Sequence, residues 1–250
     1  MPKSHLNFIG RFQAFLGQIE SAERIDNLEL TQTQKDSQKA DYFFRDREII
    51  CEFKVFESDS RHKIEDVIRP HTLRDDWPIV VGAPRPLERI LERLPDGEEI
   101  KRQIFLKVSD SVERNIRKAN GQIRDTKTSF DLPNSTGLLV LVNETVHSLT
   151  PKTIVSRIGL ALTKRTVDKK PQFDQISAIL LIQPAHVLEG SGNKPIIGLF
   201  AIENALSRNQ KLNDFVNCLM ERWGVFEGIT MEPRNWGNLD QPFVPAKWDL

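Results

Sequence analysis

The sequence predicts an α/β domain with a mixed central sheet flanked by helices and a helical insertion at about residues 60–130. Short, continuously apolar segments have the length of buried strands, and segments with helical spacing of apolar residues separate them. No repeat, low-complexity block or linker divides the 250 residues, and one enlarged domain accounts for that length. We therefore expect a single domain spanning residues 1–250.

Charge, cysteine content and hydropathy exclude several classes of protein. The 35 basic residues balance the 35 acidic ones, so attraction to nucleic acid must come from local patches. Cys51 and Cys218 are too few for a disulfide scaffold or a thiolate metal cluster. The N-terminus lacks a signal-peptide apolar region, and the longest apolar runs fall far below the ~18 residues needed to span a bilayer. These features predict a soluble protein of the reducing cytoplasm, without a membrane partner.

The first part of the chain predicts a helix followed by a β-hairpin. Within residues 6–25, apolar side chains recur every three or four residues, at Ile9, Phe12, Leu16 and Ile19. A polar connection at 31–39 leads to the segment ADYFFRDREIICEFK, residues 40–54, whose two apolar halves flank a charged turn. A helix is therefore expected to open the domain, ahead of the hairpin.

The remaining elements alternate between helices and strands. A helical region with breaks covers residues 61–128, with a short helix at 84–95 and a long one at 98–127. The apolar stripe of the long helix is Phe105, Val108, Val112, Ile116, Ala119 and Ile123. Strands are predicted at 137–144, 176–183 and 195–202, a hairpin turn at 189–195, and helices at 151–165 and 213–223. Thr150 and Pro151 have the cap and first-turn chemistry of a helix start.

The register of the first hairpin brings two carboxylates together. With Asp46 and Arg47 at the centre of the turn, Asp41 lies opposite Glu52, with β-carbons about 4.5 to 5.5 Å apart. A four-residue loop with the same centre keeps this register. Alternate residues of the second strand form one apolar face, at Ile49, Cys51, Phe53 and Val55. Glu52 and Lys54 therefore share the other face with Asp41, and Cys51 is expected to be a packing residue.

Facing carboxylates predict a cation site. Like charges opposite one another destabilise a sheet, and a divalent cation with oxygen ligands offsets that repulsion. A bound Mg²⁺ would neutralise a phosphate and lower the pKa of a water, while Lys54 would act at the nucleophile. The alternative is an exposed polar edge without chemistry. The five histidines lack a ligand spacing, so no zinc site is expected.

The order of these elements resembles the PD-(D/E)xK nuclease superfamily, which has the restriction-endonuclease-like fold. The resemblance runs through the first helix, ADYFF, IICEFKVF, the helices and GLLVLVNE, over roughly residues 8–145. It implies a Mg²⁺-dependent deoxyribonuclease, with Mn²⁺ as a substitute, in which Asp41 and Glu52 bind the metal and Lys54 is catalytic. Ala40 stands where the proline of the motif often lies, and the insertion leaves substrate choice open.

The resemblance also suggests further site residues. Many members add a glutamate from the first helix, and Glu20 and Glu23 both qualify as catalytic or metal-site residues. Extending the apolar stripe places Glu23 nearer the buried face and Glu20 on its flank, and an ordinary solvated charge is the alternative for each. Some members place a glutamine on the helix after the Glu-x-Lys strand, and Gln122 occupies a comparable position.

A basic surface accompanies Gln122. Residues 101–127 hold eight Lys or Arg against three Asp or Glu. Four of these basic residues have spacings that share a helix face: Lys107, Arg114, Arg117 and Arg124. Such a stripe can neutralise nucleic-acid phosphates without reading bases, although a solvated helix explains each side chain equally well. A second cluster with the same ambiguity consists of Lys164, Arg165, Lys169 and Lys170.

The sequence thus predicts a metal-dependent nuclease that hydrolyses phosphodiester bonds in nucleic acid, with DNA favoured over RNA by family analogy alone. The alternative is a catalytically silent nucleic-acid-binding or assembly module that retains the nuclease fold. A homodimer is compatible with both.

Overall fold

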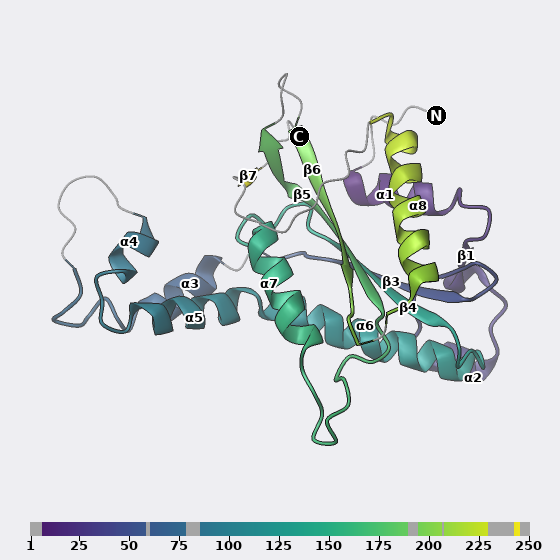
Figure 1. Cartoon of the computed structure of the whole chain (residues 1–250), viewed down its shortest axis with the longest axis horizontal. Coiled ribbons are helices and arrows are strands. Elements are labelled where there is room, and N and C mark those ends of the chain that lie inside the picture. The colour runs from purple at the N-terminus through teal and green to yellow at the C-terminus, as the bar shows by residue number, and fades with distance from the viewer. Residues whose placement is uncertain are drawn as a thin grey trace.

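One mixed sheet with helices on both faces forms the body of the protein, as the computed structural model shows (Figure 1). The structure describes residues 7–58, 61–78, 86–189, 195–206, 208–229 and 243–245. The predicted α/β class is confirmed. Within the described ranges, no helix combines the length and the apolar character needed to cross a membrane.

The sheet has seven strands in the described chain, in the spatial order β1-β2-β3-β4-β5-β6, and β7 also pairs with β5. The strands are β1 (Glu23–Arg24), β2 (Tyr42–Phe44), β3 (Ile49–Val55), β4 (Thr136–Val142), β5 (Ala178–Glu189), β6 (Pro195–Glu203) and β7 (Phe243–Pro245). The central strands β3, β4 and β5 are parallel, and the outer pairings are antiparallel. Parallel strands are covered on both faces, which explains the continuous apolar run of β4.

Eight α-helices and one 3₁₀ helix lie in the described chain. They are α1 (Phe8–Leu16), η2 (Ile25–Asn27), α2 (Gln32–Asp36), α3 (Arg61–Ile68), α4 (Leu87–Leu91), α5 (Gly97–Val108), α6 (Asp110–Ser129), α7 (Pro151–Leu162) and α8 (Gln210–Glu227). The predicted start of α7 is confirmed, because the Thr150 hydroxyl accepts a hydrogen bond from the Thr153 amide at 3.2 Å and Pro151 lies in the first turn.

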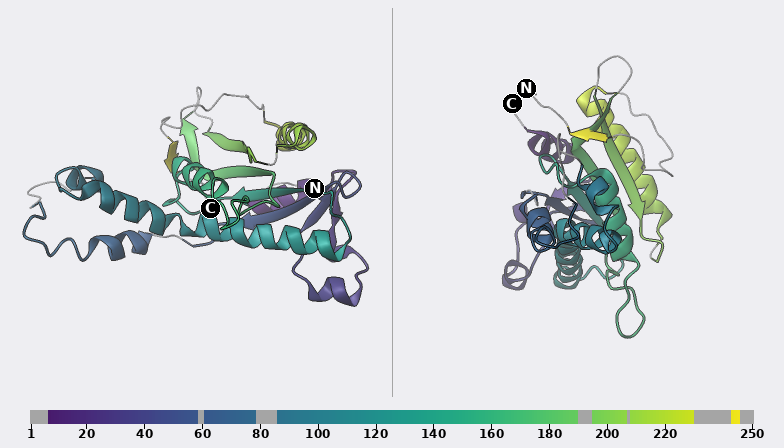
Figure 2. Two further views of the ribbon diagram at one scale, coloured as in Figure 1. Left: turned by 60° about the horizontal axis from the view of Figure 1, so that its bottom comes forward. Right: turned by 90° about the vertical axis from the view of Figure 1, so that its left-hand side faces the viewer.

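Different helices cover the two faces of the sheet (Figure 2). On one face α6 and α7 pack on the sheet, and Ile116 and Ile123 of α6 are fully buried with Leu139 of β4. On the other face lie α1 and α8, where the Trp223 ring packs edge-on against Phe12 with centroids 5.0 Å apart. The α6 face is the one that carries the candidate site.

The middle of the chain projects away from the sheet as α3, α4 and α5 (Figure 1). These helices share a small core of their own, formed by Leu91, Leu94 and Ile100. Gly97 starts α5 where a β-carbon would lie 1.8 Å from the Leu91 carbonyl oxygen, so this close approach requires glycine. The last helix of the predicted insertion, α6, belongs instead to the layer that covers the sheet.

Two predicted helices have different bounds in the structure. The first ends at Leu16, and Gly17 leads into turns, so the chain has left the helix before Glu20 and forms β1 at Glu23. The predicted helix at 98–127 is divided at Ser109 into α5 and α6. The Ser109 hydroxyl and the Ser109 amide both donate to the Phe105 carbonyl, at 2.5 and 3.0 Å, and Ser109 itself has non-helical backbone angles. The predicted turn at 189–195 falls largely on residues 190–194, outside the described residues.

Candidate metal centre

The first hairpin has the predicted register. Tyr42 pairs with Cys51, and Phe44 pairs with Ile49, so the next pair outward is Asp41 with Glu52. The connecting loop has the four residues between Phe44 and Ile49, with the predicted centre. Three of its residues adopt left-handed backbone angles, at Arg45, Asp46 and Arg47. The turn thus fixes which residues of the two strands face one another.

Asp41 is held by its main chain and by its carboxylate. Its amide donates to the Cys51 carbonyl at 3.1 Å, and its own carbonyl accepts from the Ile25 amide at 3.0 Å. One carboxylate oxygen, Oδ2, accepts a hydrogen bond of 2.7 Å from the Phe53 amide. Asp41 is therefore fixed against β3 and η2, and its carboxyl group also shares a side-chain hydrogen bond with Glu52.

Glu52 is a buried acid with an unused oxygen. Its exposure is only 1%, and Oε2 has no hydrogen-bond partner in the described structure. The other oxygen, Oε1, contacts the ammonium group of Lys54, whose side chain is partly exposed. Ile50 lies in the α6 core, and Glu52 and Lys54 follow at two-residue steps, so both side chains face the α6 side of the sheet.

The electrostatics of the pair are those of a crowded anionic site. Burial raises the pKa of Glu52 to about 8, with the charge of Asp41 as the second cause and Lys54 acting in the opposite direction. Burial also raises the pKa of Asp41, and the hydrogen bond from the Phe53 amide opposes this effect. The charge of Asp26, an exposed residue of η2, raises the pKa of Asp41 further. Without a cation, the raised pKa of Glu52 therefore favours a pair in which the Glu52 carboxyl keeps its proton at neutral pH.

These features fit a hard divalent cation. The two facing carboxylates, Asp41 and Glu52, share one compensating Lys54, and the charge of Asp26 adds to the repulsion at Asp41. A cation would supply a partner for Glu52 Oε2, which has none among the described residues. Across the described ranges, no three His, Cys, Asp or Glu side chains converge as a ready-made metal site. Mg²⁺ commonly takes one or two protein carboxylates and completes its shell with water and substrate phosphate. A two-carboxylate site is sufficient on this chemistry.

The structure places the two candidate glutamates of the first helix away from Asp41 and Glu52. Glu20 is exposed in the turns after α1. Glu23 lies in β1, and its carboxylate makes a two-pronged ion pair with Arg47, at 2.8 and 3.1 Å. This pair lowers the pKa of Glu23, so that its charge is already compensated. Asp26, which no sequence pattern had marked, is the further acid whose charge raises the pKa of Asp41.

Gln122 lies close to the site, but its amide is engaged with the protein. Its Nε2 donates to the Lys39 carbonyl at 2.9 Å, two residues before Asp41. Thr126, one turn further along α6, accepts a hydrogen bond from the Ala40 amide at 2.8 Å. Thr126 was not anticipated from the sequence, although its spacing of four residues from Gln122 places both on one side of the helix.

The predicted basic stripe is divided between two helices, and its arginines form ion pairs. Lys107 lies on α5, whereas the three arginines lie on α6. Arg114 pairs with Asp110 at 2.8 Å, Arg117 with Glu113 at 3.1 Å, and Arg124 with Asp125 at 3.0 Å. All three guanidinium side chains remain more than half exposed, so these pairs are weak and leave the arginines accessible to a phosphate.

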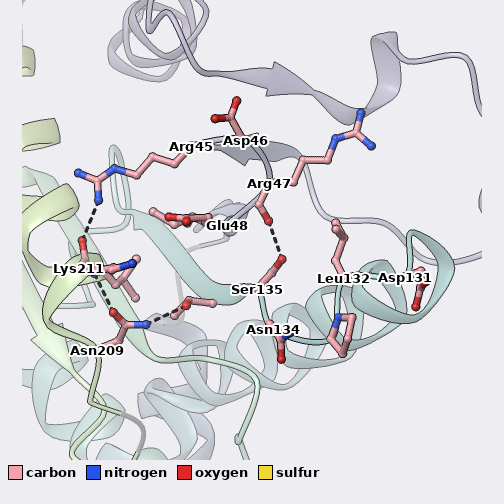
Figure 3. Close-up of a pocket in the computed structure, with 14 residues that line it drawn as sticks. Arg45, Asp46, Arg47, Glu48, Asp131, Leu132, Asn134, Ser135, Asn209 and Lys211 are labelled. Atoms are coloured by element: carbon pink, nitrogen blue, oxygen red, sulfur yellow. Dashed lines mark hydrogen bonds between the residues drawn. The ribbon is translucent and has the colours of Figure 1, made fainter.

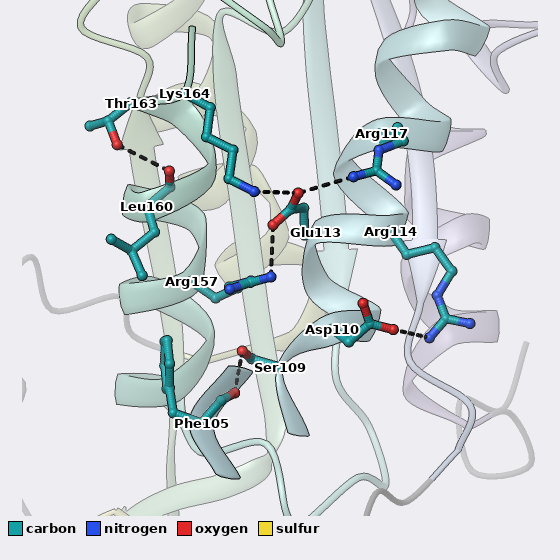
Figure 4. A network of polar contacts seen from close by, with 10 residues as sticks. All are labelled: Phe105, Ser109, Asp110, Glu113, Arg114, Arg117, Arg157, Leu160, Thr163 and Lys164. Carbon is teal, nitrogen blue, oxygen red and sulfur yellow. Dashed lines mark hydrogen bonds and ion pairs between the residues drawn. The ribbon is translucent and has the colours of Figure 1, made fainter. Parts of the chain in front are cut away.

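Glu113 is the centre of a denser network between α6 and α7 (Figure 4). Its buried carboxylate contacts Arg157 at 2.7 Å and Lys164 at 2.6 Å as well as Arg117. Lys164 belongs to the second predicted cluster, and here it joins the two helices. One carboxylate with three cations leaves an excess of positive charge on this side of α6.

A separate pocket of about 370 Å³ lies at the other end of β3 and β4 (Figure 3). The hairpin loop, the start of β4 and the start of α8 line it. Its polar groups largely satisfy one another: Ser135 donates to the Arg47 carbonyl at 2.5 Å, and Asn209 donates to Thr136 at 2.9 Å. Asp41, Glu52 and Lys54 are not among its lining residues.

Comparison of the chain with protein-family models, with curated proteins and with solved structures finds no match.

Proposed function

We propose that this protein is a metal-dependent nuclease of the PD-(D/E)xK type, with a restriction-endonuclease-like core, and that DNA is its substrate. The observation that carries the proposal is the buried Glu52 carboxylate, which lies opposite Asp41 in the hairpin and whose Oε2 has no hydrogen-bond partner among the residues that the structure describes. A buried acid of this kind is costly for stability, which favours a role in binding or chemistry over a structural one.

The roles of the residues follow from their contacts. Asp41 and Glu52 would hold Mg²⁺ or Mn²⁺, which when bound neutralises charge on a phosphate and lowers the pKa of a water. Lys54, now held at Glu52 Oε1, would be released toward the nucleophile or the scissile phosphate once Glu52 engages a cation. The exposed arginines of α6 would bind the backbone of the nucleic acid without reading its sequence.

The test combines cleavage with cation binding for the wild type, Glu52→Gln and Lys54→Met. Cleavage of plasmid DNA should require Mg²⁺ or Mn²⁺ and should fall by about a hundred-fold or more in both variants, the scale of losing one electrostatic stabiliser. Mn²⁺ binding by calorimetry should weaken in Glu52→Gln and tighten in Lys54→Met, because the latter removes an ammonium group that competes for Glu52.

The exposed Glu48 of the same hairpin provides the matched control, since Glu48→Gln removes a carboxylate of the same type away from the pair. Wild-type cleavage rates in Glu52→Gln would refute the assignment. Cation binding and DNA binding without cleavage would instead support the non-catalytic module. An RNA substrate in parallel distinguishes a ribonuclease.

A further inference from the structure

Two polar side chains of α6 hold the chain immediately before Asp41. The Thr126 hydroxyl is fully buried, accepts a hydrogen bond from the Ala40 amide at 2.8 Å and donates to the Gln122 carbonyl at 2.7 Å. Gln122 Nε2 donates to the Lys39 carbonyl at 2.9 Å. A hydroxyl has one proton to donate and lone pairs to accept, so the Thr126 hydroxyl is used in both directions.

These bonds engage both polar groups of one peptide unit, the one that joins Lys39 to Ala40, and the next residue is Asp41. The Asp41 main chain is tied to Cys51 and to Ile25, and its carboxylate to the Phe53 amide. The α6 contacts therefore complete a frame that fixes the main chain on the N-terminal side of Asp41. Apart from these polar contacts, α6 faces the sheet mainly through apolar side chains, which fix the layers but not the position of one carboxylate.

We propose that Thr126 and Gln122 are positioning residues, which hold the Asp41 carboxylate at the place where a divalent cation can bridge it to Glu52. This inference rests on the proposed metal-dependent function. Its physical reason is the strict geometry of Mg²⁺, which requires oxygen ligands at about 2.0 to 2.1 Å. If the main chain before Asp41 were mobile, the Asp41 carboxylate would lie within this ligand distance for only part of the time.

The principal test variant is Thr126→Val, which keeps the size of the side chain and removes both hydrogen bonds. Mn²⁺ affinity should fall by about ten- to a hundred-fold, the usual effect of losing an outer contact that orients a metal ligand. Thr126→Ser should restore most of the affinity because it keeps the hydroxyl. Thr128→Val is the matched control, since the exposed Thr128 hydroxyl donates to the Arg124 carbonyl within the helix at 3.1 Å.

Cleavage kinetics separate positioning from general damage. In Thr126→Val, kcat should fall at a fixed low Mg²⁺ concentration, recover when Mg²⁺ is raised, and leave the KM for DNA unchanged. A fall in kcat that a higher Mg²⁺ concentration does not reverse, or a change in KM without a change in kcat, would overturn the positioning role. Near-ultraviolet circular dichroism in EDTA checks that the variant is folded.

Amide hydrogen exchange of the metal-free protein tests whether Thr126 restrains the main chain at Ala40 and Asp41, without relying on cation binding. Exchange at Ala40 and Asp41 should be faster in Thr126→Val than in wild type and Thr128→Val. Unchanged exchange at Asp41 would overturn the inference. A wild type that neither binds Mn²⁺ nor cleaves DNA refutes the proposed function, and with it the role in cation binding, while the exchange difference decides whether Thr126 positions Asp41.

Discussion

Replacing Glu52 with glutamine is expected to stabilise the metal-free protein at neutral and alkaline pH. The native state holds Glu52 with a pKa of about 8, against an ordinary value of 4.5, because the carboxyl is buried opposite Asp41. Glutamine keeps the shape of the side chain and carries no charge that burial could penalise. The comparison therefore isolates the cost of ionising this one buried acid.

The sign and size of the effect follow from the difference in pKa between the folded and unfolded states. A pKa that is raised on folding gives stability that is fully present below the unfolded value and is lost as the pH rises through the folded value. Between about pH 5 and pH 8, Glu52 keeps its proton in the native protein but has lost it in the unfolded chain over about 2.5 pH units. At about 1.4 kcal/mol per unit, the loss of stability is about 3.5 kcal/mol. The raised pKa of Asp41 adds a loss of the same sign.

The measurement is the free energy of unfolding in urea across this pH range, in EDTA, for wild type, Glu52→Gln and the control Glu48→Gln. The wild type and Glu48→Gln should both lose stability as the pH rises, whereas the curve of Glu52→Gln should be flatter by about 3.5 kcal/mol over the range. Parallel curves for all three proteins would show that Glu52 does not titrate as a buried acid, and the reasoning about the site would fail.

Two further predictions concern other parts of the molecule. The double variant Arg117→Ala, Arg124→Ala should flatten the slope of log affinity for duplex DNA against log salt by up to about 2 if both arginines contact phosphates, at about 0.9 each. The control is Arg69→Ala with Arg102→Ala, at residues directly after α3 and on α5. An unchanged slope in the first variant would make the α6 arginines an ordinary solvated surface. Acidification should destabilise the protein through His186, whose pKa is lowered by burial and then by His147. Nε2 donates to the His147 carbonyl, so the neutral ring accepts at Nδ1 from Gln183, and protonation removes that acceptor. Stability should fall by at most about 1.4 kcal/mol per unit of pKa difference as the pH drops from about 6.5 toward the folded pKa, and urea unfolding of His186→Gln should lack this component, so that equal acid slopes would contradict it.

The sequence by itself determined the features that depend on neighbouring residues. The turn between Phe44 and Ile49 sets the hairpin register, and the register places Asp41 opposite Glu52. The continuous apolar run of β4 and the Thr150–Pro151 start of α7 are equally local signals. In each case the side-chain period or the cap chemistry lies within a few residues of the element that it specifies.

Tertiary structure decided the features that depend on distant partners. The strand β1 exists because residues 23 and 24 pair with β2, and two residues of strand pairing leave no periodic pattern to read. The early end of α1 leaves Glu20 in a turn and Glu23 in β1, where Glu23 pairs with Arg47, while η2 carries Asp26, whose charge acts on Asp41. The hydrogen bond from the Ala40 amide to the Thr126 hydroxyl joins residues 86 positions apart. Such contacts form only when α6 docks on the sheet. The apolar spacing specifies which side of the helix is buried, but no local pattern encodes which strand that side meets.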